Sequence, residues 1–339
     1  MKDCNIFITG ATGFIGKKLL VKLVQNNLVS ALVRPESKNK INDFPEKKVQ
    51  VIFGNLLDNA SYSGLLDKAD YVFHLAGLFK VEASKEDLFK NNVLGTKKLL
   101  EACVGKKNIK KIIYFSTAYV VGIKEGNFIK EDESYPNKFK NWYEWSKSKA
   151  EQTVLDFYKK HKLPIIVVRP VIVYGPNNSY GFYHVLNLIA KGKLWVFPGK
   201  KENKIHLVHI EDVVNATVEL ADLKNNIGEI YHICDDHPNS CREIIETVCQ
   251  CLNVKPPLVN LPRYVLKFIS RLPIWRLTFK EISPESLDYF LYNQSFLNKK
   301  LKSCGYLFSY PTPLEGLRLT IDWYSKNNLL PKTNRDVSI

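Results

Sequence analysis

The apolar residues in the first half of the chain form short continuous runs, separated by stretches in which they recur at helical spacing. Runs rich in β-branched and aromatic residues predict strands at 5–9, 30–33, 49–53, 71–75, 111–115 and 165–168. Helical spacing predicts helices near 15–24, 88–103 and 142–161. Strands that are apolar throughout and alternate with helices are typical of a parallel sheet covered on both faces. The pattern therefore predicts an α/β fold with a doubly wound parallel sheet of the Rossmann type.

This rhythm ends after Pro176, where residues 177–181 are rich in turn formers. The pattern returns to the sheet at 207–220 and 229–234, and from about 238 it is mostly helical with interspersed prolines. We therefore expect residues 1–176 plus 206–235 to form the main sheet domain. Residues 177–205 plus 236–330 should form a smaller, mostly helical cap over a substrate, and 331–339 a frayed tail.

Composition and charge exclude several classes of protein. The 339 residues are 45% hydrophobic, with a net charge of +15 from 49 basic and 34 acidic side chains. The basic residues are scattered and no RNA-binding signature accompanies them, so we expect a solvated lysine-rich surface and no nucleic-acid partner. Seven cysteines without a Cys-x-x-Cys spacing argue against a disulfide framework and a metal site. The N-terminus lacks signal-peptide architecture and no apolar run reaches transmembrane length, so a cytoplasmic location is expected.

One segment leaves two interpretations open. Residues 263–280 mix basic side chains with many apolar ones. This is the composition of an amphipathic helix that touches a membrane, and also of a helix that packs over a substrate pocket. The packing interpretation is the favoured one.

The first strand is followed by the glycine-rich segment 9–16, Thr-Gly-Ala-Thr-Gly-Phe-Ile-Gly. Gly10 permits a tight turn, Gly13 permits close approach of a pyrophosphate, and Gly16 permits close packing of helix on strand. The start of the following helix offers backbone N–H groups and a favourable dipole to phosphates. A motif of three glycines is weak alone, but its place in the first strand-to-helix turn predicts a dinucleotide site.

The residue at the end of the second strand bears on the choice between NAD and NADP. NAD enzymes usually carry an acid there, whereas this strand ends on Arg34, which suits a 2′-phosphate. Glu36 lies close enough in sequence to reach a ribose. Arg34 could also be an exposed loop residue that does not bind the cofactor. NADP is therefore the preferred cofactor and NAD the other choice.

Tyr143 and Lys147 lie four residues apart on a predicted helix and so share one face. A phenol with a pKa near ~10 needs a neighbouring cation to act as an acid and base at neutral pH. Such a pair is common on surface helices, but Thr117 stands at the end of the preceding strand, at the edge where ligands bind. The three residues predict a hydride-transfer site.

These segments together resemble the extended short-chain dehydrogenase/reductase superfamily, also called the NAD-dependent epimerase/dehydratase family. Eight motifs stand in the family's order over nearly the whole chain: 9–16, 54–58, 74–77, 92–96, 116–122, 143–147, 169–176 and 208–212. Val33-Arg34-Pro35 and the tail near 303–324 are similar to the branch of dihydroflavonol-4-reductase-like, 3β-hydroxysteroid-dehydrogenase-like and hopanoid-associated-epimerase-like proteins.

The resemblance implies roles for individual residues. Tyr143 would be the acid and base, Lys147 would lower its pKa, and Thr117 would bind the reacting oxygen, with Ser116 as the competing choice. The residues implied to bind NAD(P) are Gly10, Thr12, Gly13, Phe14, Ile15, Gly16, Arg34, Asn55, Leu56, Ala76, Gly77, Asn92, Ser116, Tyr143, Lys147, Pro170 and Ile172. Relatives often dimerise through the helices that match 88–103 and 142–161, which makes a homodimer an expectation.

The sequence departs from the family at places that bear on substrate choice. Asn55 stands where the family often has Asp, and Lys204-Ile205-His206-Leu207 stands where many nucleotide-sugar members carry an Arg-Asp pair that grips a diphosphate. The favoured hypothesis is an NAD(P)-dependent reductase or dehydrogenase acting on the carbonyl or alcohol carbon of a small organic molecule. The alternatives are an NAD-dependent nucleotide-sugar epimerase or dehydratase, and a non-catalytic cofactor-sensing protein on the same fold.

Overall fold

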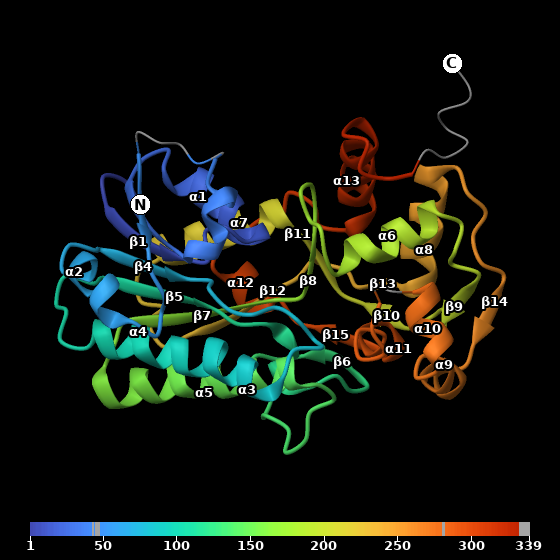
Figure 1. Ribbon diagram of the computed structural model, residues 1–339, viewed down its shortest axis with the longest axis horizontal. Coiled ribbons are helices and arrows are strands. Elements are labelled where there is room, and N and C mark those ends of the chain that lie inside the picture. The colour runs from blue at the N-terminus through green and yellow to red at the C-terminus, as the bar shows by residue number, and fades with distance from the viewer. Residues whose placement is uncertain (43, 45–47, 280–281, 332–339) are drawn as a thin grey trace. The chain divides into compact units, whose positions relative to one another are not determined.

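The computed structural model describes residues 1–42, 44, 48–279 and 282–331 (Figure 1). The chain divides into two compact units. The first holds residues 1–121, 134–170 and 213–231, and the second holds 122–133, 171–212 and 232–339. The tail predicted at 331–339 falls almost wholly outside the described residues.

A seven-stranded sheet organises the first unit, in the order β12-β7-β5-β4-β1-β2-β3. Neighbouring strands from β3 to β7 pair in parallel, in the order typical of Rossmann-type sheets. The strands are β1 (Asn5–Thr9), β2 (Leu28–Val33), β3 (Val49–Phe53), β4 (Tyr71–His74), β5 (Lys111–Phe115), β7 (Ile165–Pro170) and β12 (Ile230–Ile233). The predicted doubly wound parallel sheet is confirmed.

Helices cover both faces of this sheet. Figure 1 shows α1 (Phe14–Leu23) on one face and the neighbouring helices α4 (Gly95–Cys103) and α5 (Trp142–His161) on the other. The remaining helices here are α2 (Ser63–Leu66), α3 (Lys85–Leu88) and most of α7 (Ile210–Asp222), with 3₁₀ turns η1 (Pro35–Lys40), η2 (Asn59–Ser61) and η4 (Ala118–Val121). The core below α4 and α5 contains Phe7, Val72, Ile112, Val154 and Ile165.

The helix predicted at 88–103 is continuous but irregular. It consists of α3, the π-helical stretch η3 (Phe89–Leu94) and α4. π-helical turns occur often at functional sites, because the wide turn reorients a side chain. Here the π-helical stretch contains Asn92, whose side chain is buried.

The second unit combines short strand pairs with helices. Its strands are β6 (Gly126–Ile129), β8 (Ile172–Tyr174), β9 (Val196–Pro198), β10 (Lys204–Ile205), β11 (Leu207–His209), β13 (Asn239–Ser240), β14 (Val259–Leu261) and β15 (Gln294–Phe296). Its helices are α6 (Phe182–Ala190), α8 (Cys241–Leu252), α9 (Arg263–Ile269), α10 (Pro273–Thr278), α11 (Asp288–Leu291), α12 (Lys299–Ser303) and α13 (Pro313–Lys326). Packed faces of α6, α8 and α13 form its core.

The two-unit division differs from the predicted domain boundaries. Residues 122–133, 171–176, 206–212 and 232–235 belong to the second unit rather than to the sheet domain. The reason lies in short pairings that the apolar pattern does not reveal, because β6 pairs with β15 and β8 with β11.

Candidate active site

The glycine-rich segment forms a tight turn between β1 and α1. Gly10 has a positive φ of 77°, and a Cβ there would lie 2.6 Å from the backbone nitrogen of Ala76. A Cβ on Gly16 would lie 2.0 Å from the carbonyl oxygen of Gly10, so only glycine lets helix and strand pack this closely. The predicted conformational reasons for Gly10 and Gly16 are confirmed.

The start of α1 is suited to an anion. Gly13 is its N-cap and supplies no side-chain cap, and the first turn carries no acidic residue. Gly13 is exposed, and Thr12, Phe14 and Ile15 beside it are half-buried. Backbone N–H groups and the helix dipole therefore meet a surface on which nothing in the first turn repels a phosphate. These residues fit the diphosphate of a dinucleotide.

The turns after β2 and β3 lie at the same edge of the parallel sheet. Arg34 follows the last residue of β2 and is exposed, with its backbone carbonyl accepting from the N–H of Ser37. Asn55 is exposed and its Oδ1 accepts from the N–H of Leu57, while the carbonyl of Leu56 accepts from the hydroxyl of Tyr62. The predicted adenine and ribose contacts are thus placed at one edge, and their role stays a prediction.

Asn92 fixes the loop that follows β4. Its Oδ1 accepts from the N–H of Leu78 at 2.6 Å, and its Nδ2 donates to the carbonyl of Leu78 at 3.2 Å and to Oγ of Ser146 at 2.9 Å. A Cβ on Gly77 would lie 3.1 Å from Oδ1 of Asn92, so this loop packs closely on the π-helical stretch. Asn92 therefore holds Ala76 and Gly77 near α5 and uses its own amide for that purpose.

Lys147 is buried at the end of β5. Its Nζ donates to the carbonyl of Phe115 at 2.6 Å and to the hydroxyl of Tyr114 at 3.2 Å, and lies 4.8 Å from the centre of the Tyr114 ring. Burial lowers the pKa of Lys147 to about 8, and the charge of Glu151 opposes that change. Removal from water disfavours an ammonium, whereas hydrogen bonds and a nearby carboxylate favour it. Burial therefore holds the pKa of Lys147 well below its ordinary value.

A buried polar cluster lies beside Tyr114. Its ring centroid lies 5.6 Å from that of His74, whose Nε2 lies 2.9 Å from Oγ1 of Thr96, and this Oγ1 donates to the carbonyl of Asn92 at 2.7 Å. Because that hydroxyl has a single proton, Nε2 of His74 must donate to it, and Nδ1 accepts from Thr9 at 2.7 Å. Burial lowers the pKa of His74 to about 3, so the ring is neutral at physiological pH.

Tyr143 lies one helical turn before Lys147 and is half-buried. Its ring packs edge-on against Phe79, with the ring centroids 4.9 Å apart. The helix starts where Asn141 caps it, since Oδ1 of Asn141 accepts from the N–H of Glu144 at 2.9 Å. Tyr143 and Lys147 thus lie near the start of the same helix, and the phenol is one turn ahead of the buried ammonium.

The two hydroxyls at the end of β5 differ in their surroundings. Oγ1 of Thr117 donates to the carbonyl of Pro170 at 3.5 Å and accepts from the N–H of Tyr119 at 3.4 Å, both long contacts. Oγ of Ser116 is buried and has no hydrogen-bond partner within the described chain. An unpartnered buried hydroxyl costs free energy, so Ser116 stays a serious rival to Thr117 as the group that binds a reacting oxygen.

A buried ion pair holds the middle of α5 against β7. Nε of Arg169 donates to Oε2 of Glu151 at 3.0 Å and its Nη2 donates to Oε1 at 2.5 Å, while the hydroxyl of Tyr135 donates to Oε1 at 2.6 Å. Both charged side chains are almost fully buried. Pro170 ends the same strand, whereas Ile172 lies in β8 of the second unit, where it pairs with Leu207.

The NAD dependent epimerase/dehydratase family model matches residues 6–234, which include every residue described above. The chain belongs to this family. The fold is shared with solved structures as well: a UDP-glucuronic acid 4-epimerase from Bacillus cereus in complex with NAD superposes with a TM-score of 0.76 at 22% identity, over 95% of this chain and 99% of the other.

Curated relatives of this family member carry different activities. A dTDP-D-glucose 4,6-dehydratase from Dictyostelium discoideum is 30% identical over 270 residues, which cover 72% of this chain and 61% of that protein. A 2-alkyl-3-oxoalkanoate reductase from Shewanella oneidensis is 26% identical over 274 residues, 77% of this chain and 70% of the other. The matched part of the chain therefore spans less than two thirds of the length of the Dictyostelium protein. The relatives include both a dehydratase and a reductase.

Sequence reasoning missed Tyr114, which helps to position Lys147, and the buried polar residues beside it. Tyr114, Thr96 and His74 were not predicted as part of the site, although all three occupy family motifs or the strand beside them. The available signal was three polar side chains in otherwise apolar strands and helix faces. Such groups are buried in pairs or chains because an isolated one would lose its hydrogen bonds to water.

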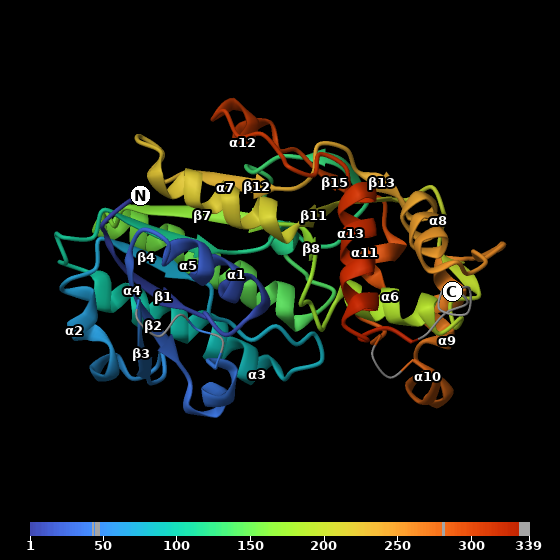
Figure 2. The same ribbon diagram turned by 90° about the horizontal axis from the view of Figure 1, so that it is seen from above.

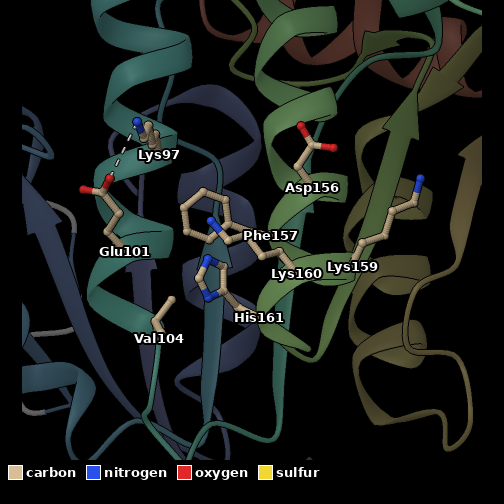
Figure 3. A pocket seen from close by; sticks show the side chains of 8 residues that line it. All are labelled: Lys97, Glu101, Val104, Asp156, Phe157, Lys159, Lys160 and His161. Atoms are coloured by element: carbon tan, nitrogen blue, oxygen red, sulfur yellow. Dashed lines mark ion pairs between the residues drawn. The ribbon is translucent and has the colours of Figure 1, made fainter.

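A separate hollow lies at the other end of α5. Figure 3 shows Lys97 and Glu101 of α4 facing Asp156, Phe157 and His161 of α5 across it, with Val104, Lys159 and Lys160 also lining it. His161 follows Lys147 by fourteen residues, about 21 Å along a helix. This hollow is therefore distinct from the predicted catalytic residues.

Proposed function

We propose that this enzyme uses NAD to oxidise a carbinol carbon of a nucleotide-activated sugar, as the first step of an epimerisation or dehydration. The observation that carries the hydride chemistry is the buried, hydrogen-bonded Lys147 one turn after Tyr143 at the carboxyl end of β5. The family is NAD dependent by its description, and the dehydratase and epimerase relatives are named for sugar nucleotides. This substrate class replaces the small carbonyl compound favoured from sequence.

Each residue has a defined task in this proposal. A bound nicotinamide supplies the acceptor and later the donor of hydride. Tyr143 takes the proton from the sugar hydroxyl, and the ammonium of Lys147 lowers the free energy of the resulting phenolate. Thr117 or Ser116 donates a hydrogen bond to the reacting oxygen, and the start of α1 binds the cofactor's diphosphate.

The test is to release nucleotide from the purified protein and then supply UDP-glucose and dTDP-glucose with NAD. We expect NAD in the released fraction or tight NAD binding, together with conversion of at least one sugar nucleotide. Tyr143→Phe should bind NAD as well as the wild type and lose conversion, whereas Tyr71→Phe, at the opposite end of the sheet, should keep it. Conversion that survives Tyr143→Phe would refute the assigned chemistry.

A second candidate is an NADP-dependent reductase of a small carbonyl compound. It is favoured by one observation, the exposed Arg34 directly after β2, where a guanidinium fits a 2′-phosphate. Separate titrations with NADH and NADPH distinguish the two candidates. Tight NADPH binding that weakens in Arg34→Ala, but not in Lys38→Ala, would favour the reductase. NAD binding of equal affinity in the two variants would favour the sugar-nucleotide enzyme.

We also propose that two copies associate through η3–α4 and α5. Exposed apolar side chains line this surface, among them Phe89, Leu94 and Val104. Light scattering of the eluting protein should give twice the mass of the chain. Leu94→Glu should shift that mass to a monomer, and an unchanged mass would contradict the surface.

A further inference from the structure

Exposed apolar side chains gather in one part of the second unit. Trp195 is 68% exposed, Leu258 88%, Tyr264 76% and Phe268 67%. Val259, Leu272 and Ile274 are also exposed. We call these seven side chains the apolar face; they come from β14, α9 and α10 and from the residues just before β9, β14 and α10.

Local structure brings these segments together. Strands β9 and β14 pair in parallel with Val196 opposite Val259, so Trp195 and Leu258 stand side by side at the start of the pair. Helices α9 and α10 share a small core in which Leu266 and Trp275 are buried. Figure 1 shows β9, β14, α9 and α10 grouped at one end of the unit, and Figure 2 shows α9 and α10 side by side there.

Helix α9 carries apolar or aromatic side chains on two sides. Leu266 points into the small core, while Tyr264 and Phe268, four residues apart, share the outward side. A soluble surface helix normally carries polar residues outward. The outward side of α9 instead presents two large aromatic rings between its basic residues.

Within the two segments that carry this face, all charged side chains are basic. Residues 182–201 and 253–280 together contain ten Lys and Arg and no Asp or Glu. In the described part of these segments, Arg263 pairs with Glu125 and Lys267 with Asp288. Lys191, Lys193, Lys255 and Arg271 are exposed beside the apolar face.

We infer that the apolar face docks on a bilayer surface that contains anionic phospholipid. Exposed Leu and Phe side chains enter the acyl boundary, Trp195 and Tyr264 suit the headgroup level, and the exposed cations meet lipid phosphates. Single-stranded nucleic acid matches the charge but gains nothing from aliphatic side chains such as Leu258 and Leu272. No helix within the described residues is long and apolar enough to cross a membrane.

The experiment is flotation of the full chain with vesicles of phosphatidylcholine alone or mixed with phosphatidylglycerol. We expect flotation with the mixed vesicles, loss of most of it at high salt, and little with phosphatidylcholine alone. Replacing both aromatic residues, Tyr264→Ser with Phe268→Ser, should weaken binding by about tenfold or more, since each loses most of its buried apolar area. Arg271→Glu tests the charge in a variant that keeps the apolar residues.

Matched controls separate this face from general stickiness and charge. Leu307→Ser removes an apolar side chain that is 84% exposed outside the two segments, and Lys160→Glu changes the net charge as Arg271→Glu does. Both controls should float like the wild type. Thermal melting of every variant checks that it folds.

Several results would overturn the inference. The first is absence of flotation, and the second is equal flotation of the face variants and the controls. The third is self-association in free solution that the double serine variant abolishes, because this result would assign the apolar face to a second copy of the chain. RNA that displaces the protein from the vesicles, except for the part of the binding that the aliphatic side chains contribute, would assign the apolar face to nucleic acid.

Discussion

The two ends of α5 carry the same type of residue in opposite surroundings. At its start, Lys147 is buried and donates to the carbonyl of Phe115 and the hydroxyl of Tyr114. At its end, Lys159 and Lys160 are exposed beside the hollow shown in Figure 3. The difference comes from what each end meets, the polar carboxyl end of β5 or solvent. A lysine acquires an altered pKa when it is buried against acceptors for its hydrogen bonds. Sequence spacing alone does not distinguish such a buried lysine from an exposed one.

The largest effect should follow removal of the buried charge. Lys147→Met should lower kcat/KM by about a thousandfold, in the range of a lost acid–base group, because Tyr143 loses the cation that stabilises its phenolate. Lys160→Met, at the exposed end, should leave kcat/KM unchanged. Steady-state rates with the substrate that the wild type converts give the comparison, and similar losses in both variants would contradict it.

The next effect concerns stability. Glu151→Gln leaves Arg169 buried without its carboxylate, so the free energy of unfolding should fall by about 3 kcal/mol. Glu101→Gln breaks an exposed pair with Lys97 and Lys98 and should change it by less than about 0.5 kcal/mol. Urea unfolding of both variants measures the difference. Equal losses would mean that burial does not separate the two ion pairs.

A smaller effect separates the hydroxyl of Tyr114 from its ring. The ammonium form of Lys147 is the useful one, so activity should fall as pH rises through its pKa of about 8. Tyr114→Phe keeps the ring but removes an acceptor that favours the ammonium, so the pKa falls and the alkaline limb moves down by roughly one pH unit. A merely structural role would lower activity at every pH without that movement, and Tyr71→Phe should leave the profile in place.

The elements that depend on local pattern were predictable from sequence. The helix Trp142–His161 has the predicted bounds, and Asn141 supplies the cap at its start. Gly10 and Gly16 were predictable because each position demands glycine. Gly10 has a positive φ, and a Cβ on Gly16 would lie 2.0 Å from the carbonyl oxygen of Gly10. These features need only neighbours in sequence or one strand-to-helix turn.

Features that depend on distant partners were not predictable. The contacts of Lys147 with Tyr114 and of His74 with Thr96 join α5 to β5 and β4 to α4, and no spacing in the sequence reveals them. The predicted helix over 263–280 divides into α9 and α10 around Pro273, and only the structure shows that α9 buries Leu266 while exposing Phe268. The domain boundaries shifted for the same reason, since β6 and β8 pair with strands later in the chain.

The most direct test of the central claim is a single-turnover measurement with NAD bound to the protein. Sugar nucleotide is added and the absorbance of reduced nicotinamide is followed, for the wild type and for Tyr143→Phe. We expect reduced nicotinamide to form in the wild type and to form at least about a hundredfold more slowly in the variant, although both bind NAD equally. Equal rates in both proteins, or reduction of nicotinamide only when NADP and a non-sugar alcohol are supplied, would contradict it.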